Sequence, residues 1–345
     1  MGPQVHKVAL LLPLTGPSAG IGQPMLDAAQ LALFDVAGEQ FELLPRDTKG
    51  TPQGAAEAAR KALSEGASLI LGPLLAQEVQ AVKPIAAGAG VDVLAFSTDW
   101  TLAGNGTYIM GFVPNDQVQR VTGYARSRGV TRFVALAPRS PYGDAVVSAL
   151  QASAQRFGGQ VAQVERYEPT LADPAVPARQ VAQAPIAPQA VMLAEGGERV
   201  RALGAALLAN GVDPGRVKLL GTGLWDEPGL GREPALAGAW FAAPAPEQRA
   251  DFEARFESLY GKKPPRLATL AYDATALAGA LARMGGPVPY DRANLTNPNG
   301  FAGVDGLFRL RPNGSVERGL AVLEVTPEGA RVLDPAPQTW DVLGQ

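Results

Sequence analysis

The chain has 345 residues, which is too many for one ordinary hydrophobic core and enough for two α/β lobes. Hydrophobic residues make up 46% and charged residues 18%, a globular composition that excludes an intrinsically disordered chain. The formal net charge of −3 gives no electrostatic reason to expect nucleic acid or an anionic membrane as a partner.

Two chemically versatile residue types are almost missing. Cysteine is absent, which removes disulfides, thiolate nucleophiles and zinc–cysteine sites, and histidine occurs once, as His6. A Ser–His–Asp triad or a histidine metal site is thereby close to excluded, and no G-x-x-x-x-G-K-[ST] phosphate loop occurs. Paired carboxylates stay open as an alternative, although no spacing singles out a pair. We expect no enzyme activity, no cofactor and no metal.

The first part of the chain alternates short apolar runs with segments of helical period. Strands are predicted at 8–14, 41–44, 69–71 and 91–96, and helices at 24–36, from Thr51 onward and at 77–87. Thr51 is placed to cap its helix, Pro52 suits the first helical position, and Gly66 is placed to end it. Apolar strands that alternate with helices predict a parallel sheet covered on both faces.

The same alternation restarts after Pro114. Helices are predicted at 117–128, 144–157 and 198–210, and strands at 132–137, 161–167, 190–194, 217–220 and 240–242. The segment 171–188 is rich in proline, so any helix there must be short or broken. Two rounds of one pattern predict two similar lobes.

The pattern changes after Pro246. Two helices are predicted at 247–260 and 267–284, followed by strand-like segments at 307–310, 320–325 and 331–333. The periodicity does not indicate which lobe these helices cover.

A series of short segments resembles the leucine/isoleucine/valine-type periplasmic binding proteins, which have the periplasmic binding protein-like I fold. The segments occur in the family's order over nearly the whole chain: 8–17 with Gly22, Asp47, 70–73, 96–98, 114–117, 142–143, 272–274 and 301–306. Each segment is weak alone, but the ordered set is specific for the fold.

The resemblance implies two doubly wound parallel-sheet lobes joined by a hinge of three crossovers. The expected N-terminal lobe is 1–117 plus 246–317, and the expected C-terminal lobe is 118–245 plus 318–345. The ligand would lie in the cleft between the lobes, next to the carboxyl ends of the strands.

The resemblance also implies which residues contact ligand. In amino-acid-binding relatives, hydroxyls and amides at a helix start and in the following loop hold the carboxylate; here these positions are Ala76 and Gln77, then Ser97, Thr98, Asp99, Trp100 and Thr101. Leu74–Gln77 supplies no hydroxyl, so half of that clamp is missing. Tyr142 matches a cleft-facing aromatic residue, and Ile21 matches a position that packs on the ligand. For each, a purely structural role, as a cap, turn or core residue, is the alternative.

Two acidic residues and two tryptophans complete the expected site. Glu195, at a strand end, and Asp226 are candidates to hold a ligand's amine, because the matching family position is Gly223 here. Trp100 and Trp225 stand beside carboxylates and could form an aromatic floor for a sugar, an aromatic acid or a quaternary amine, or else a contact that closes the lobes.

The expected function is that of an extracytoplasmic solute-binding protein, which captures an amino acid or related polar compound for an ABC importer and passes it to the permease. The alternative is a protein similar to penicillin-binding protein activators, which acts by protein–protein contact in cell-wall synthesis. A sugar-responsive repressor is disfavoured, since only seven residues precede Val8. We expect a periplasmic or membrane-anchored location, with the native leader absent from this sequence and no transmembrane segment.

Overall fold

The computed structural model describes residues 4–36, 38, 40–284 and 286–340, which divide into two compact units. The first unit comprises residues 4–112, 246–319 and 338–340, and the second comprises 113–245 and 320–337. The boundaries differ from the expected ones at three places. The second unit contains residues 113–117, which were expected in the N-terminal lobe, and the first unit contains residues 318–319 and 338–340, which were expected in the C-terminal lobe. One reason is that α4 (Pro114–Ser127) is a continuous helix packed on strands of the second unit.

The first unit is built on a five-stranded parallel sheet in the order β2-β1-β3-β4-β5. Its strands are β1 (His6–Leu12), β2 (Phe41–Asp47), β3 (Ala67–Leu71), β4 (Val93–Ala95) and β5 (Thr107–Ile109). All four described pairings in this sheet are parallel, as the alternating pattern predicts. β5 escapes prediction because three residues are too few to show a periodicity.

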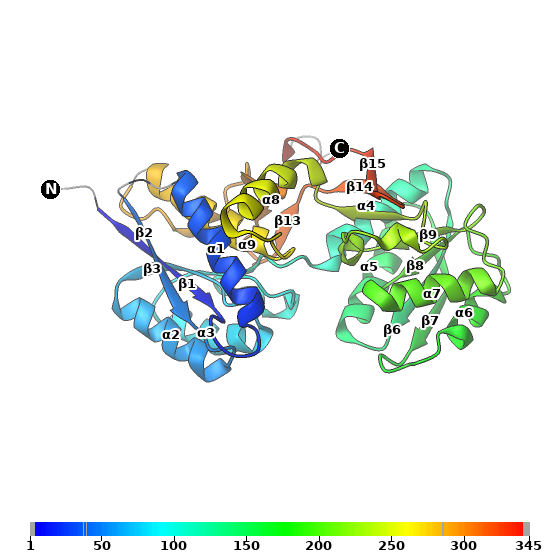
Figure 1. Cartoon of the computed structure of the whole chain (residues 1–345), viewed down its shortest axis with the longest axis horizontal. Helices are drawn as coiled ribbons and strands as arrows, with labels where there is room; N and C mark the ends of the chain where they lie inside the picture. Colours follow the sequence, from blue (N-terminus) through cyan, green and yellow to red (C-terminus); the bar gives the residue numbers. More distant parts are fainter. Residues whose placement is uncertain (1–3, 37, 39, 285, 341–345) are drawn as a thin grey trace. The chain divides into compact units, whose positions relative to one another are not determined.

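Helices and a small antiparallel sheet complete this unit (Figure 1). The helices are α1 (Ala19–Val36), α2 (Pro52–Ser64), α3 (Ala76–Gly88), α8 (Pro246–Tyr260), α9 (Ala268–Met284) and α10 (Arg292–Leu295), with a 3₁₀ turn η1 (Trp100–Leu102). The small sheet has the order β11-β12-β13, from β11 (Phe301–Gly303), β12 (Gly306–Leu310) and β13 (Val316–Arg318).

Local chemistry explains the ends of α2. The Thr51 hydroxyl accepts a hydrogen bond from the Gly54 amide, Pro52 is the first helical residue, and Gly66 follows in the left-handed region at φ 96°. The predicted cap is confirmed. α1 begins at Ala19, earlier than predicted, and Pro24 lies inside it.

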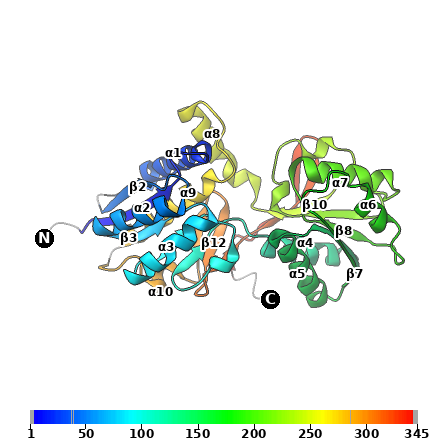
Figure 2. The same cartoon turned by 90° about the horizontal axis from the view of Figure 1, so that it is seen from below.

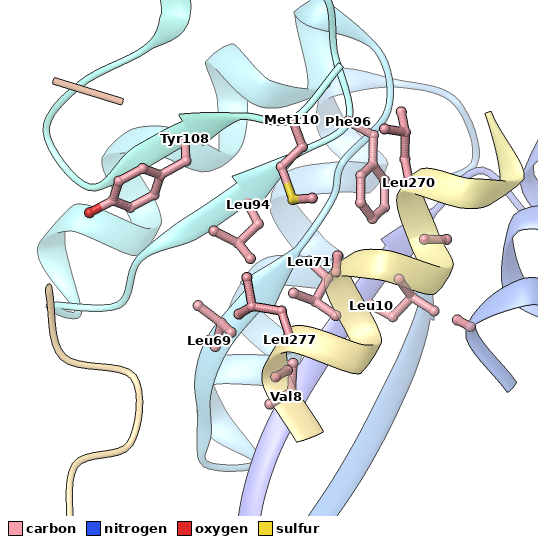
Figure 3. Packing of buried hydrophobic residues seen from close by; sticks show 14 of the residues in the cluster. Val8, Leu10, Leu69, Leu71, Leu94, Phe96, Tyr108, Met110, Leu270 and Leu277 are labelled. Carbon is pink, nitrogen blue, oxygen red and sulfur yellow. The ribbon is translucent and has the colours of Figure 1, made fainter. Parts of the chain in front are cut away.

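The core of the first unit lies between the sheet and α9 (Figure 3). Leu270 and Leu277 project from α9 onto buried residues of the central strands, among them Leu10 and Leu71. Full burial of each such side chain stabilises the fold by about 1.5–3 kcal/mol. α1 packs along α9, so these two segments are held together although more than two hundred positions separate them.

The second unit is built on a seven-stranded sheet in the order β15-β14-β10-β9-β8-β6-β7. Its strands are β6 (Arg132–Pro138), β7 (Gln160–Tyr167), β8 (Ala190–Leu193), β9 (Lys218–Gly221), β10 (Trp240–Ala243), β14 (Ala321–Thr326) and β15 (Gly329–Asp334). β6 to β10 pair in parallel, whereas β14 and β15 are antiparallel. The sheet is therefore mixed, because a hairpin and not a βα unit extends it beyond β10.

Helices cover both faces of this sheet. They are α4, α5 (Pro141–Arg156), α6 (Ala175–Ala182) and α7 (Gly197–Ala209), with 3₁₀ turns η2 (Gly223–Trp225) and η3 (Leu230–Arg232). Figure 2 shows α4 and α5 on one face and α6 and α7 on the other. A buried apolar cluster lies under each pair of helices. This double layer confirms the α/β class expected for each lobe.

Candidate functional site

Polar side chains gather in the second unit where β6, β7, β8 and β9 end. Because these neighbouring strands are parallel, the residues that end or follow them lie along one edge of the sheet. They are Tyr142 in the first turn of α5, Tyr167 at the end of β7, Glu195 after β8, and Thr222 and Trp225 after β9. We call these five residues the strand-end cluster.

Hydrogen bonds join the members of the strand-end cluster. The hydroxyls of Tyr142 and Thr222 lie 2.7 Å apart, and the Tyr167 hydroxyl donates to Glu195 Oε1 at 2.7 Å. Arg199 Nε lies 3.8 Å from the same carboxylate oxygen. The Glu195 charge thus already has a donor and a cation beside it, and a ligand's amine would have to compete with Arg199.

Burial governs the tyrosines of the strand-end cluster. It raises the pKa of Tyr142 to about 12, and the nearby Glu195 charge acts in the same direction. Burial and the Glu195 carboxylate also raise the pKa of Tyr167. Both phenols therefore stay protonated at neutral pH and can donate hydrogen bonds. The cluster offers neutral hydroxyl donors beside one carboxylate.

Trp225 has a different role from the one expected. Its side chain is 1% exposed, its ring centroid lies 6.2 Å from that of Phe241, and its indole nitrogen donates to the Glu195 carbonyl oxygen at 2.8 Å. A Cβ at Gly221 would lie 2.1 Å from the indole, so the ring fills the space under that glycine. Buried in the core, Trp225 does not form the aromatic floor that the sequence offered as one of two possibilities, and it positions the Glu195 backbone.

The residues next to Trp225 shape the same edge. Asp226 is half-buried, and its amide donates to the Gly223 carbonyl at 3.0 Å, which closes the η2 turn. The buried Gln117 accepts from the Gly223 amide at 2.8 Å. Sequence reasoning missed Gln117, Tyr167 and Thr222 as members of this region. The available signal was position: Tyr167 ends a predicted strand and Thr222 lies two residues after the end of another.

In the first unit, the loop after β4 contains five predicted residues. Ser97 is 5% exposed, and its hydroxyl accepts from the Asp99 amide at 3.0 Å. The Asp99 carboxylate accepts from the Thr101 amide at 3.1 Å and from its hydroxyl at 2.5 Å, while Thr98 is exposed and Trp100 half-buried. The hydroxyls of Ser97 and Thr101 therefore shape a turn, which is the structural role named above as the alternative.

The start of α3 holds the other predicted anion site. Ala76 is half-buried and Gln77 is exposed, and Glu78 follows with an exposure of 0%. Glu78 Oε1 accepts from the Leu75 amide at 3.1 Å, and among the described residues Oε2 has no hydrogen-bond partner. Burial raises the pKa of this carboxyl. The helix end thus keeps its attraction for an anion best when Glu78 is protonated.

Asp47 organises the end of β1. Burial raises the pKa of its carboxyl, but hydrogen bonds from the Thr15 hydroxyl and the amides of Lys49, Leu14 and Thr15 outweigh burial and hold the pKa below its usual value. The loop that it fixes leads into α1, where Ile21 is 39% exposed. Within the first unit, Ile21, the start of α3 and the β4 loop all lie at the carboxyl edge of the sheet.

Among the residues that the structure describes, no group of three or more His, Cys, Asp or Glu could hold a metal ion. No described helix is both long and apolar enough to cross a membrane.

Comparison with known proteins gives a family. Residues 6–330 match the profile of a family described as periplasmic binding protein. A curated relative, the penicillin-binding protein activator LpoA of Mannheimia succiniciproducens, is 28% identical over 167 residues, which are 48% of this chain and 28% of LpoA. The aligned segments span less than half the length of either curated relative that matches.

Solved structures share the fold over nearly the whole chain. A Rhodospirillum rubrum protein assigned to a branched-chain amino acid ABC transporter has a TM-score of 0.86 at 22% identity, covering 95% of this chain and 100% of its own. A solute-binding protein of an ABC transporter from Rhodopseudomonas palustris, in complex with 3,4-dihydroxybenzoic acid, has a TM-score of 0.70 at 17% identity, covering 97% and 98%. At these identities the likeness concerns the fold.

Proposed function

Because the chain belongs to the periplasmic binding protein family, we propose that it is an extracytoplasmic solute-binding protein that captures a small polar ligand for an ABC importer. The observation that carries the proposal is the strand-end cluster, where neutral hydroxyl donors and one carboxylate converge at the carboxyl ends of four parallel strands. Such an edge is where open α/β sheets hold ligands. Catalysis has no part in the proposed role.

The proposed ligand is a small carboxylate, either an amino acid or a related acid. The neutral hydroxyls of Tyr142 and Thr222 would donate hydrogen bonds to its polar groups. The Rhodopseudomonas palustris relative holds an aromatic acid, which supports including such acids beside amino acids. Binding would favour a conformation that the permease recognises, in the periplasm or at the outer face of the membrane.

A thermal-shift screen of the purified chain against amino acids, aromatic acids, sugars and peptidoglycan fragments tests the proposal. A ligand at about 100 times its Kd stabilises the folded state by about 2.7 kcal/mol, which is a readable shift. If no compound shifts the melting temperature, the importer role is wrong. The match to LpoA then favours the alternative, an activator of cell-wall synthases, and capture of those enzymes becomes the assay.

The substitution Tyr142→Phe assigns the site. It keeps the ring and removes the hydroxyl that meets Thr222, so we expect ligand affinity measured by calorimetry to fall about fivefold to tenfold. Tyr260→Phe is the matched control, because the Tyr260 hydroxyl donates only to the Asp27 carbonyl on α1 among the described residues. Equal affinity in the two variants would move the ligand away from the strand-end cluster.

A further inference from the structure

A cavity of about 890 Å³ lies in the first unit at the amino ends of β1, β3 and β4. This is the edge of the sheet opposite to Ser97 and the start of α3. Its lining includes Val5, His6, Asp92, Val288, Tyr290 and Arg292. The volume is in the range of small-molecule sites in proteins.

Asp92 is the polar group in this cavity whose hydrogen bonds are least complete. The residue is 9% exposed, and among the described residues Oδ2 has no hydrogen-bond partner. Arg292 Nε lies 3.6 Å from Oδ2, but the Arg292 side chain is 69% exposed to solvent. Burial raises the pKa of the Asp92 carboxyl more than the Arg292 charge lowers it. A buried carboxylate with so little compensation is costly unless a donor reaches it.

The other charged groups of the lining are engaged elsewhere. Lys7 Nζ donates to the Glu65 carbonyl at 3.1 Å, at the end of α2. The Asp291 carboxylate accepts from the Asn294 amide at 2.8 Å and caps α10. Asp92 Oδ2 is therefore the buried acceptor of this lining that a bound molecule could satisfy.

The remaining walls are apolar or aromatic. Val5 is 46% and Val288 is 60% exposed, so both present apolar surface at the mouth of the cavity. Tyr290 is buried, its hydroxyl donates to the Ala278 carbonyl at 2.9 Å, and its ring meets the His6 imidazole edge-on at a centroid distance of 6.2 Å. The aromatic pair is therefore fixed in place before any molecule enters.

We propose that this cavity binds a small organic amine, whose ammonium group donates to Asp92 Oδ2 and whose apolar part lies against Val5, Val288 and Tyr290. An ionised carboxylate only accepts hydrogen bonds, so its partner must be a donor, and a cationic donor makes the stronger bond. The site uses residues of one unit and is independent of the proposed importer function.

His6 provides a direct readout, because it is the only histidine of the chain and its imidazole signals in a ¹H–¹³C NMR spectrum are unambiguous. Phenethylamine serves as the probe, with 2-phenylethanol and 3-phenylpropionate as controls of the same shape without the positive charge. We expect phenethylamine at millimolar concentration to shift the His6 signals saturably, and the two controls to leave them in place.

Two substitutions with opposite expected effects test the role of Asp92. Asp92→Asn removes the negative charge at constant shape and should weaken phenethylamine binding at least about tenfold. Arg292→Gln removes the cation that competes for Asp92 and should strengthen binding about threefold. Arg283→Gln, an equal change of charge at an exposed residue outside the lining, is the control and should leave binding unchanged.

Val288→Trp fills the mouth of the cavity from an exposed position and should abolish binding even if Asp92→Asn fails to fold. The proposal is overturned if phenethylamine leaves His6 unaffected, or if Val288→Trp and Arg292→Gln both bind like the unmodified chain. Tyr142→Phe should bind phenethylamine normally, so a failure of the importer function and a failure of this site are separately visible.

Discussion

Among single residues, Trp225 shows best how burial changes a role. Its neighbours in sequence, Leu224 and Asp226, are exposed or half-buried, so a residue between them looks like part of a surface loop. The structure instead turns the indole inward against Phe241 and bonds its nitrogen to the Glu195 carbonyl. Trp225 is therefore not part of a surface loop, and it contributes to the site by positioning the residue that carries the carboxylate, Glu195.

We expect Trp225→Phe to lower the free energy of unfolding by about 2–3 kcal/mol, since it removes the donor to the Glu195 carbonyl and leaves space under Gly221. Urea denaturation followed by circular dichroism measures this loss. Trp100→Phe is the control: Trp100 is half-buried in a loop, and its substitution should cost less than about 1 kcal/mol. Equal losses in the two variants would contradict the buried role of Trp225.

Among the elements, a buried ionic network joins α8, α9 and the turn between β11 and β12. Arg266 donates to both oxygens of Asp305 at 3.0 and 2.9 Å, and Arg249 of α8 lies 3.5 Å from the same carboxylate. Asp273 of α9 accepts from the Val304 amide at 2.8 Å. A Cβ at Gly303 would lie 2.4 Å from the Asp273 carboxylate, so only glycine allows this approach.

The pKa values of the two carboxyls in this network, Asp273 and Asp305, are shifted in opposite directions. Burial and the neighbouring Asp305 charge raise the pKa of Asp273 to about 7. Burial also acts on Asp305, but the Arg266 guanidinium outweighs it and holds the pKa of Asp305 below its usual value. Asp273 therefore stabilises the fold fully below its unfolded pKa of 3.8, and this contribution is lost as the pH rises through about 7.

The variant Asp273→Asn should change this pH dependence. Asparagine keeps an acceptor for the Val304 amide but does not titrate. The free energy of unfolding of the variant, relative to that of the unmodified chain, should therefore rise by at least about 1 kcal/mol between about pH 4 and about pH 8. Asp305 titrates in both proteins, so its effect cancels to first order. Chemical denaturation at the two pH values provides the comparison, and parallel stability profiles would show that Asp273 is not the titrating group.

At the scale of the whole molecule, the chain passes between its two units at 112–113, 245–246, 319–320 and 337–338, once more than the three crossovers expected. Residues 338–340 belong to the first unit because Trp340 anchors them there. Trp340 is 8% exposed, and the Arg309 guanidinium lies over its ring at 4.4 Å.

We expect Trp340→Ala to lower the free energy of unfolding by about 3 kcal/mol, because it removes a buried ring and its cation–π contact. Calorimetric unfolding measures the effect. Phe34→Ala removes an aromatic ring that is 84% exposed and should cost less than about 1 kcal/mol, so a similar loss in both variants would mean that Trp340 does not anchor the end of the chain.

The amino-acid sequence by itself determined the α/β class, most of the helices and strands, the cap at Thr51 and the likeness to periplasmic binding proteins. It could do so because apolar periodicity, caps and turns depend on residues a few positions apart. The end of a predicted strand also marked Glu195, and the resemblance marked Tyr142; both lie at one edge of the sheet.

Only the tertiary structure decided which residues meet across the chain. It placed Trp225 in the core, joined β14 to β10 in antiparallel register, and brought Asp92 into one cavity lining with residues 287–292. These outcomes depend on contacts between segments that are far apart in sequence. Periodicity predicts that a side chain is buried, but it does not identify the residues that contact it.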